Sequence, residues 1–167
     1  DTSLHKILTR LKEISNWDKP LPAGWGRGVA QYEFFAGHCG QVVEVSRQGS
    51  GVKIEKVYAV IDMGTVVNPD TVKAQVEGGV IMGITAAVKN GITFANGQTQ
   101  QTNYHDNPIL RINEAPEVIV DIIADGGETI KGAGEPGLPP LAPALCNAIY
   151  AATGKRIRKL PFDINRV

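Results

Sequence analysis

One carboxylate of this chain lies in a sequence context that favours a catalytic role over simple exposure to solvent. Glu135 lies between Gly134 and Pro136, in a loop of small and stiff residues that runs over positions 132–140. Glycine lets the backbone approach other groups closely and proline restricts it, so such a loop can hold a carboxylate in one place. The loop leads into a predicted helix N-terminus, which favours an anion. Glu135 is therefore a candidate general base, and the alternative is a capping acid in a structural turn.

A second candidate lies on a helix predicted to start at Asn68 and Pro69, which suit the cap and the first helical position. Next to its apolar face runs a stripe of small residues with one amide, formed by Gln75, Gly78, Gly79, Gly83 and Ala86. Each glycine inside a helix costs about 1 kcal/mol relative to alanine. Several in one stretch predict that another backbone or a ligand approaches this face closely. Tight packing of the helix on a sheet is the alternative.

Other reactive residue types form no recognisable set. The histidines share no metal-ligand spacing with one another or with Cys39 and Cys146, so no metal ligand is expected and both thiols are expected to be buried. The pair His105 and Asp106 is expected to be a hydrogen-bonded loop, with an oriented base as the alternative. The sequence also lacks the serine elbow, the dinucleotide-binding glycine pattern and the phosphate-binding loop of common enzyme classes.

Composition excludes several classes of partner. The chain has 167 residues, with 17 Lys and Arg against 17 Asp and Glu, and 43% of its residues are hydrophobic. This balance is typical of a globular domain, and a net charge of zero gives no broad basic field for nucleic acid or for anionic membranes. No run approaches the roughly 18 apolar residues of a membrane helix. We therefore expect no nucleic-acid partner and no membrane span.

The elements that must position these candidates follow from hydrophobic periodicity and from turn signals. An amphipathic helix is predicted over 4–14, and a connection rich in proline and glycine follows it. Further elements are predicted in this order: strands at 28–36, 41–46 and 52–63, a helix over 69–88, a hairpin with strands at 92–94 and 98–100, a strand at 117–124, a helix over 141–153 and a short strand near 157–160. The third strand is apolar on both faces at its far end and should be central.

Because strands and helices interleave irregularly, the predicted fold class is α+β. We expect a mixed or antiparallel sheet packed with two main helices, plus the N-terminal amphipathic helix. Residues 1–20 are expected to form that helix and a linker, and residues 21–167 the main domain.

Several motifs, taken together, carry a resemblance to a known family. The order and spacing of three of them resemble the C-terminal part of the molybdopterin-binding subunit of the xanthine oxidase/aldehyde oxidase family: Asp62-Met63-Gly64 with Val67-Asn68-Pro69, Gln75-Val76-Glu77-Gly78-Gly79, and Gly132-Ala133-Gly134-Glu135-Pro136. The flanking segments 25–30, 103–108 and 151–161 look most like the β subunits of isoquinoline 1-oxidoreductases and their aldehyde-oxidising relatives. The resemblance runs from about Leu21 to the C-terminus.

The resemblance implies molybdenum hydroxylation. In that family a glutamate deprotonates a hydroxide on molybdenum, which attacks an N-heterocycle or an aldehyde. Hydride passes to a sulfido ligand, and electrons leave through iron–sulfur clusters. Glu135 matches the glutamate and takes over the role of base, Gln75 matches a glutamine near the molybdenum cofactor, and Gly132, Ala133 and Gly134 match the loop that brings backbone close to the metal site.

The chain departs from the family in its length. Family molybdenum subunits are several times longer, and their other cofactor-binding segments and the cysteine sets of iron–sulfur clusters are absent here. The chain, which begins at Asp1, is thus expected to be a domain of a longer subunit, to need molybdopterin in the complete enzyme and to retain none alone. Its expected partners are the remainder of that subunit, an iron–sulfur subunit and a small-molecule substrate.

Two other functions stay open at this point. One is a non-catalytic module that keeps the fold and binds a partner through the surface once packed against the missing half. The other is a small-ligand binder that uses the space beside Gln75. Localisation is not readable from the sequence.

Overall fold

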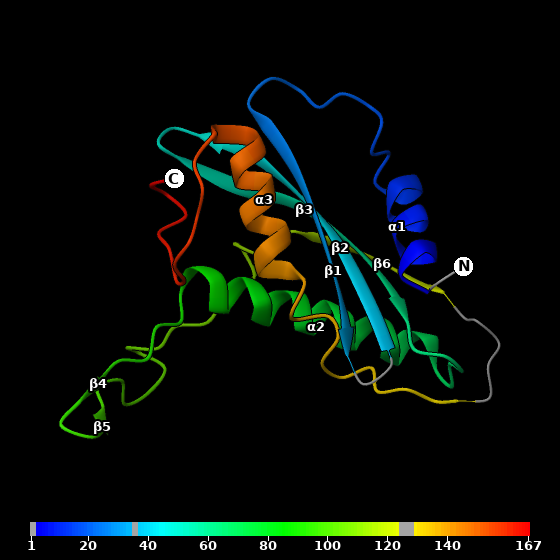
Figure 1. Ribbon diagram of the computed structural model, residues 1–167. Coiled ribbons are helices and arrows are strands. Elements are labelled where there is room, and N and C mark those ends of the chain that lie inside the picture. The colour runs from blue at the N-terminus through cyan, green and yellow to red at the C-terminus, as the bar shows by residue number, and fades with distance from the viewer. Residues whose placement is uncertain (1–2, 35–36, 124–128) are drawn as a thin grey trace.

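In the computed structural model, which describes residues 3–34, 37–123 and 129–167, a four-stranded mixed sheet carries helices on both faces (Figure 1). The elements follow in this order: α1 (Ser3–Ile14), β1 (Trp25–Phe34), β2 (Gly37–Gln48), β3 (Gly51–Asp62), α2 (Pro69–Val88), β4 (Phe94–Ala95), β5 (Gln98–Thr99), β6 (Glu117–Ile123) and α3 (Leu141–Thr153). The predicted α+β class is confirmed.

The sheet has the strand order β1-β2-β3-β6. The first three strands form an antiparallel meander, while β6 runs parallel to β3, with Lys56 opposite Glu117 and Asp62 opposite Ile123. The chain between β3 and β6 contains α2, since parallel neighbours need a long crossover. The central position predicted for the third strand is confirmed, because side chains on both faces of β3 are buried at its far end.

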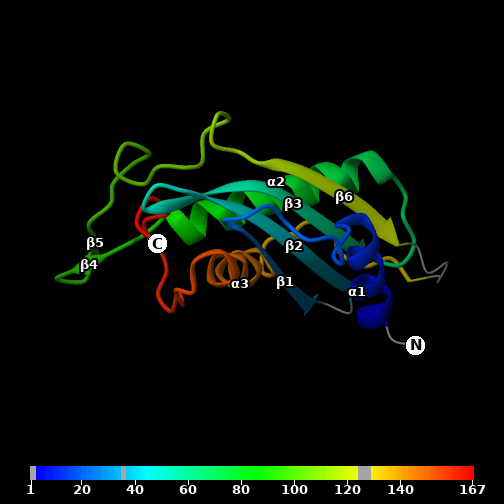
Figure 2. The same ribbon diagram turned by 90° about the horizontal axis from the view of Figure 1, so that it is seen from above.

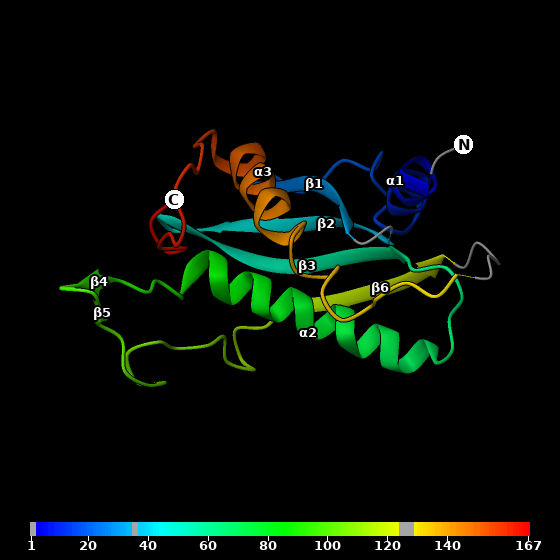
Figure 3. The same cartoon turned by 60° about the horizontal axis from the view of Figure 1, so that its bottom comes forward.

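Alternate residues of the central strands build cores on opposite faces. On one face Val43 and Val57 belong to a core cluster with residues of α2 and α3. On the other face Val42 and Tyr58 belong to a cluster with Ile7 and Leu11 of α1. Figure 3 accordingly shows α1 and α2 on opposite sides of the sheet. The helix predicted over 4–14 is confirmed as α1, whose apolar stripe is buried as its spacing predicts.

Helix α2 begins as the sequence predicts. The side-chain oxygen of Asn68 accepts a hydrogen bond from the Thr71 amide at 3.0 Å, and Pro69 occupies the first turn. Helix α3 covers exactly the predicted range and ends at Gly154, whose φ of 76° is left-handed. Both helices lie on the face of the sheet that carries the glycine-rich loop, so this face positions the candidate site.

The β4–β5 hairpin stands on an arm that projects beyond the end of α2 (Figures 1 and 2). Its turn has positive φ at Asn96 and Gly97, which is typical of a two-residue hairpin. Its strands are shorter than predicted, and β1 begins three residues earlier than predicted. Positions 35, 36 and 124, where two of the predicted strands end, lie outside the described residues.

The final strand predicted near 157–160 is wrong. These residues run as an irregular segment, and Pro161 directly after them has no N–H to donate to a ladder. The next amide, that of Phe162, donates instead to the Ala87 carbonyl of α2 at 3.0 Å. The C-terminal segment therefore packs on the helix and adds no strand to the sheet.

Candidate functional site

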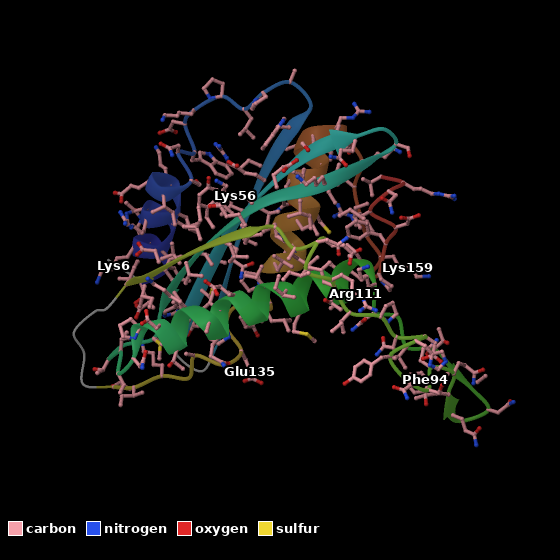
Figure 4. The ribbon with its side chains drawn as sticks, turned by 180° about the vertical axis from the view of Figure 1, so that it is seen from behind. Lys6, Lys56, Phe94, Arg111, Glu135 and Lys159 are labelled. Carbon is pink, nitrogen blue, oxygen red and sulfur yellow. The ribbon has the colours of Figure 1, made fainter. Side chains whose placement is uncertain are left out.

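A pocket of about 460 Å³ lies between α2 and the glycine-rich loop, and it contains both main candidates. Gln75 borders it from the helix, while Gly134 and Glu135 border it from the loop. The position that a Cβ of Gly134 would take lies 3.7 Å from Gln75 Oε1, so the two segments are in contact range. Figure 4 shows Glu135 beside α2, on the side away from the sheet.

The rest of the lining is small or apolar. It consists of Ala74, Gly78, Gly79, Met82, Leu138 and Pro139, and among the described residues no Lys or Arg borders the pocket. Both Gln75 and Glu135 are exposed. The site thus offers one carboxamide and one carboxylate on an otherwise apolar concave surface, which is a common composition for a binding pocket.

Glycines of α2 bring the loop onto the helix. A Cβ on Gly79 would lie 3.0 Å from the backbone carbon of Gly137, and a Cβ on Gly137 would lie 2.9 Å from the Val76 carbonyl oxygen. The distance at Gly137 is shorter than real Cβ contacts, and the distance at Gly79 is tighter than nearly all of them. The close approach predicted from the glycine stripe is therefore made by the backbone of the loop that carries Glu135, and Gly78 stays open toward the pocket.

The start of the loop is fixed to the end of β3. The Lys131 amide donates to the Met63 carbonyl at 3.0 Å, and the Thr65 amide donates to the Thr129 carbonyl at 3.2 Å. At the turn Gly64 has φ 74°, and a Cβ there would lie 2.1 Å from the Thr129 carbonyl oxygen. The Asp-Met-Gly motif of the sequence is thus the backbone anchor for the segment that leads to Glu135.

The structure does not bring every predicted site residue into the pocket. Gly132 and Ala133 do not border it: Gly132 is exposed with open space at its Cβ position, and Ala133 packs on the cluster around Val72 and Val76. Sequence reasoning missed Ala74, Met82, Leu138 and Pro139. Spacing could have indicated three of them. Met82 lies seven residues after Gln75 on the same helix, and Leu138 and Pro139 lie three and four residues after Glu135.

The other reactive residues lie elsewhere. Asp106 accepts hydrogen bonds from the amides of Thr102 and Asn103, and these bonds lower its pKa to about 2. His105 is 74% exposed at 3.6 Å from Asp106. The loop is a hydrogen-bonded turn, as expected. Cys39 is buried, which raises the pKa of its thiol to about 12, but Cys146 is only partly buried, so the expectation of two buried thiols is correct for Cys39 alone.

Within the part of the chain that the structure describes, no group of three or more His, Cys, Asp or Glu side chains could hold a metal ion. The described helices include none that is both long and apolar enough to cross a membrane.

The two neighbouring glycines of α2 allow a matched test of this packing. Gly78→Ala should raise the free energy of unfolding by about 0.5–1 kcal/mol, because an exposed helical glycine gains from a side chain that meets nothing. Gly79→Ala should not give this gain, since its methyl group meets the Gly137 backbone. Urea denaturation of both variants measures the difference, and equal effects would contradict the close approach of the loop.

Comparison with known proteins shows the family of the chain. The family described as "Molybdopterin cofactor-binding domain" matches residues 6–116. The chain is 33% identical to the isoquinoline 1-oxidoreductase subunit beta of Brevundimonas diminuta, over 93% of this chain and 20% of that protein. It is 31% identical to the aldehyde oxidoreductase molybdenum-binding subunit of Escherichia coli K12, over 82% of this chain and 20% of that protein. The chain thus spans about a fifth of the length of these relatives.

A solved structure shares the fold. Quinoline 2-oxidoreductase from Pseudomonas putida 86 superposes with a TM-score of 0.66 at 23% identity, over 78% of this chain and 18% of that one. The resemblance read from the motifs is therefore confirmed at the level of the family. The match over about two thirds of the sequence shows that this chain belongs to the molybdopterin cofactor-binding domain family.

Proposed function

We propose that this chain is part of a molybdenum-dependent hydroxylase that oxidises an N-heterocycle of the isoquinoline kind, or an aldehyde, with oxygen taken from water. In this proposal Glu135 is the general base, and residues 21–167 are the C-terminal molybdopterin-binding domain of a longer subunit, preceded by the helix and linker of residues 1–20. The observation that carries it is the common pocket of Glu135 and Gln75, which lie sixty positions apart in the sequence.

The relatives support the substrate class. Those named above are an isoquinoline oxidoreductase subunit and an aldehyde oxidoreductase subunit, and another relative, at 31% identity, is the nicotine 6-hydroxylase large subunit of Paenarthrobacter nicotinovorans. The substrates in these names have in common a carbon atom bonded to nitrogen or oxygen, and we infer that this carbon gains an oxygen atom. We extend this reaction type to the complete protein that contains this chain.

The pocket residues fit one part of molybdopterin. Gln75 offers an amide that can donate and accept, and the open Cβ position of Gly78 leaves room for a bulky group to reach the backbone. The phosphate of molybdopterin needs cationic or amide donors, and no Lys or Arg among the described residues borders this pocket. We therefore assign Gln75 and Gly134 to the polar, neutral part of the cofactor and leave the phosphate to other segments of the complete subunit.

When bound, the cofactor supplies a Lewis acid for water and an acceptor for two electrons. The task of this chain is to move the proton. The carboxylate of Glu135 accepts a proton from the water-derived nucleophile as the new carbon–oxygen bond forms, which is the role of a general base. Leu138 and Met82 present apolar surface beside it, which suits the flat ring of a heterocycle.

The origin of the product oxygen tests this function. The complete molybdenum subunit with its electron-transfer partner should convert isoquinoline in ¹⁸O-labelled water to a product that carries the label. Isoquinoline is a better probe than an aldehyde, because aldehydes exchange their oxygen with water unaided. An unlabelled product, or no turnover of isoquinoline and aldehydes by a molybdenum-loaded enzyme, would reject the proposal.

The isolated chain should retain no molybdenum cofactor. Its pocket is open to solvent, Met82 and Leu138 at its edge are 48% and 41% exposed, and none of the lining side chains can neutralise a phosphate. Metal analysis of the purified chain should therefore find far less than one molybdenum per chain, whereas the complete subunit should hold one. A stoichiometric metal content in the isolated chain would contradict this expectation and its proposed inactivity.

A further inference from the structure

We propose that Gln41 is a positioning residue for the proposed reaction, because its buried amide holds the turn that carries Glu135. Gln41 lies on β2 and does not border the pocket, and nothing in its sequence context singles it out. The inference rests on the proposed function of Glu135 and extends it to a residue that does not touch the site.

The turn itself is closed by a backbone hydrogen bond. The Leu138 amide donates to the Glu135 carbonyl at 3.0 Å, so Pro136 and Gly137 are the two central residues of a four-residue turn. Proline at the first central position is pre-organised for such a turn. The direction of the Glu135 side chain is therefore coupled to the orientation of this short segment.

Gln41 fixes the turn from the side of the sheet. Its Nε2 donates to the Gly137 carbonyl oxygen at 2.6 Å, across 96 positions of sequence, and the Gln41 residue is fully buried. A buried carbonyl that loses its donor has no access to water and pays the cost of desolvation. The turn is thus bound to a rigid central strand by a bond that solvent cannot replace.

Helix α2 fixes the same residue from the other side. Gly137 lies so close to Val76 that a Cβ would come within 2.9 Å of the Val76 carbonyl oxygen. Val76 is fully buried and is the direct neighbour of Gln75 in the helix. Gly137 is therefore held by both Gln41 and the backbone of α2, and these two contacts help to set the place of Glu135 relative to Gln75.

Gln41→Met is the variant that tests this role, since methionine has a similar length and volume but cannot donate. In the complete enzyme kcat should fall by about 10- to 100-fold, because a misplacement near 1 Å is enough for such a loss. KM should change little. Hydrogen exchange measured by mass spectrometry should show faster exchange of the Leu138 amide, with exchange in β2 and β3 unchanged.

Two further variants control for folding. Gln31→Met removes a glutamine from the neighbouring strand β1 that makes no such bond to the loop, and it should leave kcat and the exchange of Leu138 as in the parent. Gln41→Glu should restore most of the activity, because a buried neutral carboxyl group keeps one O–H donor. Faster exchange throughout the sheet in Gln41→Met, without rescue by Gln41→Glu, would show a general packing role and overturn the inference.

Combination with Glu135→Gln separates this inference from the proposed function. If Gln41 acts through Glu135, the double variant should be no slower than Glu135→Gln alone, because the misplaced group has already been removed. Losses that multiply would overturn the positioning role. A normal kcat in Glu135→Gln would reject the proposed function, whereas a low kcat there with a normal kcat and normal Leu138 exchange in Gln41→Met would reject the inference alone.

Discussion

Replacing Glu135 by Gln in the complete enzyme should lower kcat by about 10²- to 10⁴-fold, which is the typical contribution of a general base. The amide keeps the shape of the side chain but cannot accept the proton. Because Glu135 is exposed, borders the pocket and makes no side-chain hydrogen bond that the fold needs among the described residues, the variant should retain stability and cofactor content. Steady-state kinetics with metal analysis of the same preparation measures both.

Glu77→Gln is the matched control for this prediction. Glu77 is two residues beyond Gln75 on α2, is exposed, and does not border the pocket. Loss of the negative charge there should leave kcat near that of the parent. Equal losses in the two variants would indicate a general effect of charge, and a normal rate in Glu135→Gln would leave only a structural role in the turn.

Replacing Arg27 by Met should lower the free energy of unfolding by about 3–5 kcal/mol, because a buried ion pair that loses one partner leaves an uncompensated charge. The Arg27 and Glu44 side chains are only 9% and 8% exposed, and the Arg27 Nη2 donates to Glu44 Oε1 at 2.6 Å. Its Nη1 also donates to the Trp17 carbonyl at 2.8 Å, which fixes the connection between α1 and β1. Urea denaturation followed by circular dichroism measures the loss.

The double variant Arg27→Met with Glu44→Leu distinguishes the cost of the orphaned charge from the loss of contacts. It should regain most of the stability, since replacing both partners of a buried pair by apolar residues is often neutral or better. The exposed pair of Lys12 and Asp18 is the control, because its loss should cost at most about 1 kcal/mol. If the double variant is as unstable as Arg27→Met, the main contribution of Arg27 to stability is its hydrogen bonds to backbone carbonyls and not its ion pair with Glu44.

Local patterns predicted most elements of this fold correctly. The apolar spacing of Ile7 and Leu11 indicates α1, the cap at Asn68 and the glycine at 154 mark helix ends, and the two-sided apolar end of β3 indicates a central strand. These signals work because they depend on neighbours within a few residues. The short strand expected near 157–160 is wrong because two apolar residues, Ile157 and Leu160, cannot show whether a sheet edge is available to them.

For the candidate site, the sequence by itself determined which residues could act: one carboxylate between glycine and proline, and one glutamine beside a stripe of small residues. Only the tertiary structure decided that Gln75 and Glu135 border one pocket and that Gly132 and Ala133 do not. It also decided that Gln41 reaches Gly137, because contacts across 96 positions depend on how β2, α2 and the loop pack together. Residue types and their spacing indicate which side chains could react, because these signals depend on near neighbours in the sequence. Distances between remote segments are set only when the chain packs into its tertiary structure.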